Sequence, residues 1–172
     1  MTPERAAYHL LMLQVGLREA FDQEFDEALE NEDPLSKLIL DLTSHASDIN
    51  GCISVLQNFC CDHPPDIDAV YDLVWQDLCT RFLSGSLTDA ELANLAWTLA
   101  EDAEDWWAAD WRDFRSLWYY YDEFYDGIIL GERYLQCREL FLTQRACSPE
   151  PISAPPLPEQ TLLQRIREFF NR

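Results

Sequence analysis

The densest group of chemically active side chains in this sequence is a run of carboxylates between residues 101 and 126. Its acids are Glu101, Asp102, Glu104, Asp105, Asp110, Asp113, Asp122, Glu123 and Asp126, and the only bases among them are Arg112 and Arg115. Acids on successive turns of a helix repeat every ~5.4 Å, which is the scale of the phosphate spacing along a nucleic-acid strand. We therefore predict that this run can occupy a basic groove built for phosphates, with six side chains as phosphate mimics: Asp102, Asp105, Asp110, Asp113, Asp122 and Glu123.

A second run of acids covers residues 19–33 and contains no base. Glu24 and Glu27 lie within it, and we include both among the candidate partner-binding residues. The run is expected at the C-terminal end of a helix, where each negative charge opposes the helix dipole by roughly a few tenths of a kcal/mol. Local helix preference therefore does not account for these acids.

Aromatic side chains accompany the first acidic run. Six of them recur at steps of three and four residues, which places them on one face of a helix about five turns long: Trp107, Trp111, Phe114, Trp118, Tyr121 and Tyr125. Such a stripe most often fills a core between helices. Trp106, Tyr119 and Tyr120 lie off this stripe. We expect Trp106 and Tyr120 to be exposed anchors for a partner, because Trp and Tyr dominate binding hot spots.

Other side chains could bind a metal or act in catalysis, but their patterns are incomplete. Glu101, Glu104 and Asp105 share a helix face, as in all-α Mg²⁺-dependent nucleotide pyrophosphatases, yet such a site needs a matching cluster and a basic group for phosphate. The run from Cys60 to His63 lacks the second ligand pair of a zinc site, and His9 and His45 have no nearby sequence partner. We therefore predict no catalytic residue, metal or cofactor.

The elements that must position these side chains are helices. Apolar residues at helical spacing predict a helix from Pro3 to about Asn31, another from Leu35 that kinks or breaks at Asn50-Gly51 and continues to Cys60, and a third capped by Asp66 and ending at residues 84–86. The box formed by Thr88 and Glu91 begins the helix of the first acidic run. A last core helix is expected from Ile128 to about Ala146, with Leu135 and Phe141 inside.

Residues 148–172 have a different composition. Five prolines between residues 148 and 158 predict an extended linker, and residues 159–172 read as a short amphipathic helix. The charges of residues 148–172 as a whole cancel, since three arginines offset three glutamates. This helix can fold back on its own core, dock on a partner or a second copy, or touch a membrane. The predicted fold is therefore all-α: a compact bundle of about six helices in residues 1–147, the linker in 148–158 and the C-terminal helix in 159–172.

Composition limits the classes of partner. The chain has 172 residues, 48% hydrophobic residues and a net charge of −20, so the charge lies on the surface of a folded domain. Nucleic acid and anionic membranes are poor direct ligands for such a surface, and a basic protein is the expected partner. No signal peptide or membrane span is expected, and the six cysteines are predicted to be small buried hydrophobes in a reducing cytoplasm.

The best-fitting function is non-enzymatic: an acidic protein that inhibits a basic nucleic-acid-acting partner such as a nuclease. Two kinds of known protein share this size, charge and fold class, namely DNA-mimic antagonists of restriction or CRISPR systems and immunity proteins of nuclease toxins. Three alternatives stay open: an acidic adaptor or chaperone acting through a groove or its C-terminal helix, a metal-dependent nucleotide hydrolase, and an acidic surface that serves only solubility. A homodimer is compatible with each of them.

Overall fold

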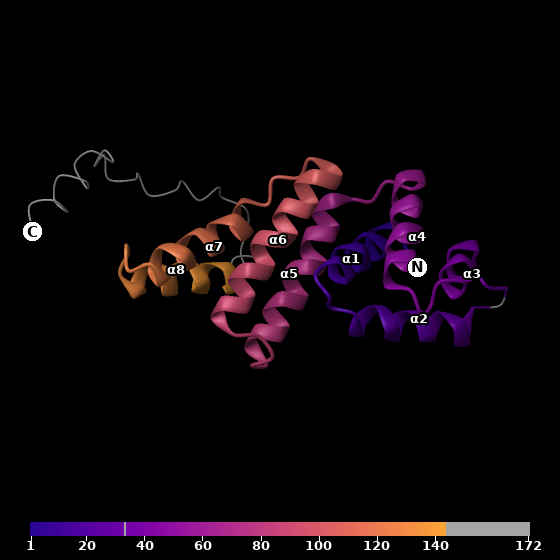
Figure 1. Ribbon diagram of the computed structural model, residues 1–172, viewed down its shortest axis with the longest axis horizontal. Helices are drawn as coiled ribbons and strands as arrows, with labels where there is room; N and C mark the ends of the chain where they lie inside the picture. The colour runs from indigo at the N-terminus through magenta and orange to yellow at the C-terminus, as the bar shows by residue number, and fades with distance from the viewer. Residues whose placement is uncertain (33, 144–172) are drawn as a thin grey trace, which may run out of the picture. The chain divides into compact units, whose positions relative to one another are not determined.

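The computed structural model describes residues 1–32 and 34–143, and this part of the chain contains helices and no strand (Figure 1). The all-α prediction is therefore confirmed for the described residues, which form eight helices where about six were expected for the whole bundle. In chain order these are α1 (Pro3–Gln14), α2 (Glu19–Asn31), α3 (Lys37–Thr43), α4 (Ile49–Asp62), α5 (Ile67–Leu83), α6 (Asp89–Trp107), α7 (Arg112–Tyr125) and α8 (Gly131–Thr143). The predicted linker 148–158 and helix 159–172 lie outside the described residues.

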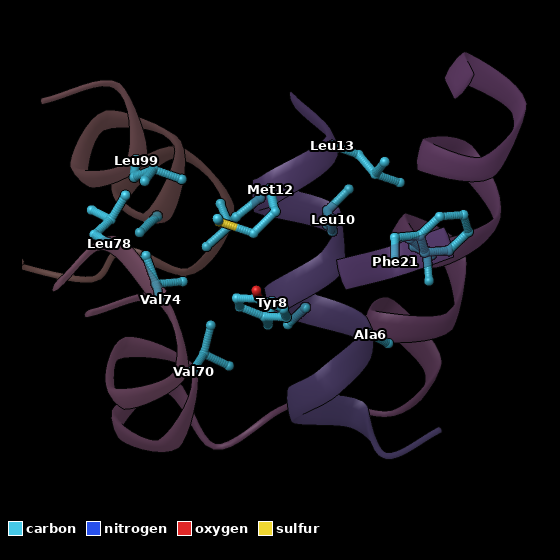
Figure 2. Close-up of a cluster of buried hydrophobic side chains, with 14 of the residues drawn as sticks. Ala6, Tyr8, Leu10, Met12, Leu13, Phe21, Val70, Val74, Leu78 and Leu99 are labelled. Atoms are coloured by element: carbon cyan, nitrogen blue, oxygen red, sulfur yellow. The ribbon is translucent and has the colours of Figure 1, made fainter. Parts of the chain in front are cut away.

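Helix α1 is the centre of the core. Every residue from Ala6 to Leu13 is buried, His9 among them, so this segment of the helix is covered on all sides. It packs against α2, α4, α5 and α6. Figure 2 shows Tyr8 and Met12 directed toward Val70 and Val74 of α5, with Phe21 of α2 on the opposite side.

The predicted first helix, from Pro3 to Asn31, is wrong in its middle. Gly16 has a φ of +81°, and its N–H donates to the carbonyl of Leu13 while the N–H of Leu17 donates to that of Met12. This is a Schellman motif, a common helix ending whose left-handed residue is usually glycine. The chain turns there, and α2 begins at Glu19. The predicted end at Asn31 and the burial of Phe21 and Phe25 are confirmed.

The second predicted helix breaks earlier than expected. Helix α3 ends at Thr43, and Asp48 caps α4 by accepting a hydrogen bond from the Asn50 N–H at 3.1 Å. Asn50 and Gly51 therefore lie in the first turn of α4, and Ala46 and Ile49, whose helical spacing predicts burial, are exposed. A Cβ on Gly51 would come within 2.4 Å of His45 Nδ1. Glycine serves here as a space for the His45 ring and not as a helix breaker.

Helices α5 and α6 agree with the sequence prediction at their starts and in their buried faces. Asp66 caps α5, and Thr88 and Glu91 form the expected capping box at the start of α6. The buried faces carry Val70, Val74 and Leu78 on α5 and Leu92, Leu99 and Ala103 on α6.

The predicted aromatic helix from Trp107 to Tyr125 is two helices. Helix α6 ends at Trp107, Ala108 adopts a left-handed φ of 53°, and α7 begins at Arg112. The expected core role is confirmed for Trp111 and Phe114, which are buried, and is wrong for Tyr125, which is 77% exposed. Once α7 folds back against α6, the stripe no longer continues along one straight helix axis, so its last member falls outside the core.

Helix α8 begins at Gly131 and not at the predicted Ile128, and the predicted end near Ala146 lies outside the described residues. Phe141 is buried as expected, and its carbonyl accepts a hydrogen bond from Trp75 Nε1 at 2.8 Å. Leu135 is 47% exposed, so its predicted core role is wrong. The inward face of α8 carries Tyr134 in its place, because Tyr134 and Phe141 are seven residues apart and share one helix face.

Two further predictions concern cysteines and membranes. Cys52, Cys60 and Cys79 are buried as expected, whereas Cys61 is exposed. The correction follows from helix geometry, since the neighbour of a buried residue on a helix points about 100° away. Among the described residues, no helix has both the length and the apolar character needed to cross a membrane.

Candidate functional site

The first acidic run lies at the junction of α6 and α7, which pack closely against each other. The Trp97 ring of α6 and the Trp118 ring of α7 meet with centroids 4.5 Å apart and hold the two helices together. Asp102, Asp105 and Trp106 occupy the last two turns of α6, and Asp110 lies in the connection that follows. Asp113, Tyr120, Asp122 and Glu123 lie on α7.

Arg115 forms ion pairs with part of this acidic run. Its guanidinium on α7 binds Glu104, lies 3.4 Å from Glu101 and lies 3.9 Å from Asp110. Asp110 is also paired with Arg112. Arginines within the protein therefore partly neutralise three carboxylates of the run, Glu101, Glu104 and Asp110. Asp110 is less available to a partner than its sequence position suggests.

Two more of the predicted phosphate mimics have neighbours within the fold. Asp113 accepts a hydrogen bond from the Tyr71 hydroxyl at 3.2 Å, and Glu123 accepts one from the Tyr119 hydroxyl at 2.6 Å. Neither partner is basic, so these contacts bring no positive charge to either carboxylate.

Asp102 and Asp105 form the least compensated part of the α6 end. They are three residues apart and so share one face of the helix. Asp105 is exposed and Asp102 is half-buried. Burial, followed by the negative charges of Asp105 and Glu101, raises the pKa of Asp102 above its ordinary value. The neighbouring charges of Asp105 and Glu101 make this end of α6 favourable for an approaching cationic group.

The two predicted aromatic anchors differ in exposure. Trp106 is exposed beside Asp105 on the last turn of α6. Tyr120 is half-buried and packs against the core, so the expectation that it is exposed is wrong, and its role as a partner anchor stays a prediction. Tyr119, the neighbouring ring, is exposed instead.

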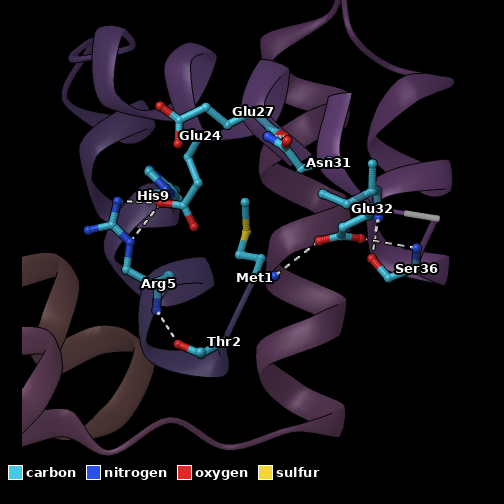
Figure 3. A network of polar contacts seen from close by, with 10 residues as sticks. Met1, Thr2, Arg5, His9, Glu24, Glu27, Asn31, Glu32 and Ser36 are labelled. Carbon is cyan, nitrogen blue, oxygen red and sulfur yellow. Dashed lines mark hydrogen bonds and ion pairs between the residues drawn. The ribbon is translucent and has the colours of Figure 1, made fainter. Parts of the chain in front are cut away.

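The second acidic run lies on α2, where Glu24 and Glu27 have different surroundings (Figure 3). Glu24 is bound by Arg5 and also lies 2.9 Å from His9 Nε2. Its carboxylate therefore links α1 to α2 and is less available to a partner. Glu27 is exposed and accepts a hydrogen bond from Gln23 at 2.8 Å. Asp26 and Glu30, one helical turn apart, are exposed as well.

The cluster of Arg5, His9 and Glu24 is the site that sequence reasoning missed. His9 is fully buried, and its Nδ1 has no hydrogen-bond partner among the described residues. Partial burial opposes ionisation of Glu24, but the hydrogen bonds from His9 and Arg5 outweigh it and lower the pKa of Glu24 to about 2. The spacing of Arg5 and His9 on one helix face was visible in the sequence. Their meeting with Glu24 depends on the turn at Gly16.

An open hollow of about 470 Å³ adjoins this cluster, lined by Arg5, Ala20, Gln23, Glu24 and Glu27. Its lining contains no Ser, Thr, Cys or His side chain that could act as a nucleophile. Among residues 1–32 and 34–143, no group of three or more His, Cys, Asp or Glu side chains has a geometry that could hold a metal ion.

Comparison with known proteins gives no relative from which a function could be inferred. No protein-family model, no curated protein and no solved structure matches this chain. Its residues and their geometry are therefore the basis of the functional argument.

Proposed function

We propose that this chain is a non-enzymatic inhibitor whose acidic helices occupy the nucleic-acid site of a basic protein, such as a nuclease or a defence effector. The observation that carries the proposal is the set of exposed carboxylates that no base compensates, on a folded helical surface of net charge −20. A DNA-mimic antagonist and an immunity protein of a nuclease toxin both act in this way, and the proposal covers both.

The distribution of ion pairs explains why so much charge remains. Six arginines of the described part, Arg5, Arg18, Arg81, Arg112, Arg115 and Arg138, are each held by at least one carboxylate. Within that same part, Lys37 and Arg133 are the bases without an ion pair. The acids that these arginines do not reach include Asp26, Glu27 and Glu30 on α2, Asp105 on α6 and Asp122 on α7.

Rigid helices give these acids a fixed spacing. Asp102 and Asp105 are three residues apart, and Asp26 and Glu30 are four residues apart, so each pair spans about one helical turn of ~5.4 Å. Charges held at this spacing on a preformed surface lose little conformational entropy when a partner binds. The exposed Trp106 beside Asp105 would add an apolar anchor at the edge of the charged surface.

Competition with nucleic acid tests the proposal. The immobilised chain is used to capture proteins from its native host at ~0.05 M salt, where charge attraction is weakly screened. Duplex DNA is then added to release whatever is bound at a nucleic-acid site, and each released protein is assayed for DNA binding or cleavage with and without the chain. We expect a released protein whose activity the chain inhibits.

Matched charge variants locate the surface. Asp102→Asn with Asp105→Asn should weaken inhibition by about tenfold or more, because each lost charge contact at a desolvated interface contributes on the order of 1–2 kcal/mol. Asp41→Asn with Asp62→Asn removes the same charge from exposed positions on α3 and α4 and should change inhibition by less than about threefold. Equal effects of the two pairs would mean that the site does not lie at the end of α6.

A further inference from the structure

The turn between α7 and α8 exposes a group of apolar side chains. Tyr125 at the end of α7 is 77% exposed, and Ile128 and Leu130 in the turn are 54% and 73% exposed. Leu135 on the following helix is 47% exposed. Single exposed apolar residues are normal on protein surfaces, but several within about ten residues mark a place where apolar surface is available to a partner.

The backbone of this turn is held in place. The carbonyl of Glu123 accepts hydrogen bonds from the N–H groups of Ile128 at 2.8 Å and Ile129 at 3.2 Å. A Cβ on Gly131 would lie 3.1 Å from the Phe124 ring, so α8 begins in close contact with α7, and Phe124 stacks on Tyr134 with centroids 5.6 Å apart. The apolar side chains of the turn are thus presented from an ordered backbone, which lowers the entropy cost of binding.

Carboxylates lie close to these side chains in the sequence. Asp122 and Asp126 lie on either side of Tyr125, and Glu132 lies in the first turn of α8. All three are exposed, and none has an ion pair within residues 1–32 and 34–143. Arg133 is the one base of the same stretch that is not tied to another element, whereas Arg138 is bound to Asp89. The turn therefore presents exposed apolar side chains together with exposed carboxylates that no base of the described residues pairs with.

We propose that this turn docks an amphipathic basic segment of another protein, with apolar side chains on one helix face and Lys or Arg beside them. The apolar face of such a segment would cover Ile128 and Leu130, and its bases would meet Asp122, Asp126 and Glu132. A second copy of the chain fits poorly, because it would bring the same carboxylates to the contact. The inference shares Asp122 with the acids named for the proposed function, but its apolar side chains and its test do not involve the end of α6, so the two proposals can fail separately.

A labelled model peptide tests this docking surface. The probe is a fluorescein-labelled peptide of leucine and lysine at helical spacing, and its binding to the full chain is followed by fluorescence anisotropy. One comparison peptide has the same composition in an order that forms no apolar face, and a second contains lysine alone. We expect the amphipathic peptide to bind about tenfold or more tightly than either, because only it can bury apolar surface together with charge.

Exposure-matched variants locate the contact. Ile128→Ser and Leu130→Ser should each weaken binding about tenfold, the usual effect of removing an apolar hot spot. Leu40→Ser and Leu83→Ser are the controls, because these leucines are 53% and 73% exposed on other elements, and they should change binding less than about twofold. Circular dichroism of each variant checks that its helices remain intact, as expected for substitutions of exposed side chains.

Four results would overturn the proposal. If all three peptides bound equally, the attraction would be between charges alone and the apolar side chains of the turn would have no role. Equal loss in the turn variants and their controls would place the contact elsewhere. A dimer in analytical ultracentrifugation that Leu130→Ser dissociates would make a second copy the occupant, and displacement of the probe by a synthetic peptide of residues 159–172 would make it the chain's own terminal segment.

Discussion

Replacing Glu24 by glutamine probes the polar cluster that joins α1 to α2. The carboxylate is bound by Arg5 and lies 2.9 Å from His9 Nε2. Glutamine keeps the size of the side chain but removes the negative charge that both partners face. The fully buried His9 ring would then keep only a neutral neighbour at Nε2, while its Nδ1 already has no hydrogen-bond partner among the described residues.

The magnitude follows from the pKa of Glu24. A change from 4.5 to about 2 corresponds to roughly 3 kcal/mol of unfolding free energy if the whole shift is counted. The side chains of Arg5 and Glu24 are 35% and 24% exposed. Water therefore screens part of the interaction, and we expect Glu24→Gln to lower the free energy of unfolding by about 2 kcal/mol at pH 7.

The pH dependence gives a sharper test than the magnitude. A carboxylate whose pKa is lowered in the folded state adds stability above its unfolded pKa of 4.5 and loses it as the pH falls toward 2. The difference between wild type and Glu24→Gln should therefore be largest at neutral pH and fall to less than half by about pH 3.

Urea denaturation followed by tryptophan fluorescence measures both quantities. Glu30→Gln is the control, because it removes the same charge from an exposed position on the same helix, and it should change stability by less than about 0.5 kcal/mol. The reasoning is refuted if Glu24→Gln behaves like this control, or if its effect is the same at pH 3 as at pH 7.

Three further predictions concern the backbone and the thiols. Gly16→Ala should destabilise the protein by about 1 kcal/mol in urea denaturation, because alanine at a φ of +81° is strained although its Cβ meets no neighbour; an unchanged midpoint would argue against the helix ending at this residue. Thr88→Ala removes the capping box of α6 and should cost about 1 kcal/mol, whereas Thr98→Ala, within the same helix, should cost clearly less. Under native conditions an alkylating reagent should modify the exposed Cys61 before the buried Cys52, Cys60 and Cys79, as mass spectrometry of peptides would show, and early modification of Cys60 would contradict the burial described.

Local signals in the sequence were enough to predict several elements. Thr88 and Glu91 begin α6 because a cap depends only on residues within one helical turn. Asp66 marks the start of α5 for the same reason. The buried positions of α5 and α6 follow from spacing alone, since each helix presents one continuous face to the core.

Helix breaks were harder to predict, because apolar spacing can continue across a turn. Leu13, Leu17 and Phe21 keep four-residue steps although the chain reverses at Gly16, whose glycine was the available signal. The break at Ala108 has no such signal, since a non-glycine residue rarely adopts a positive φ. At Gly51 the glycine was misleading, because its role depends on the ring of His45, which the turn between α3 and α4 brings against it.

The sequence was enough to predict which acids belong to the candidate site, but not which of them are neutralised by an arginine. Which acids Arg115 neutralises depends on how α7 folds back on α6, and the sequence contains no sign of that angle. The pairing of His9 with Glu24 is a stronger case. In one continuous helix, residues 15 apart would be separated by about 22 Å, so the contact exists only because the helix breaks.

The most direct test of the proposed function is the salt dependence of binding to a partner that duplex DNA releases. Affinity is measured between ~0.05 M and ~0.5 M salt for the wild type and for Asp102→Asn with Asp105→Asn. A surface that replaces phosphates should lose at least about a hundredfold in affinity across this range, and the variant should show a shallower slope. Affinity that stays constant across the same range would contradict the proposal that the acids of this protein take the place of nucleic-acid phosphates.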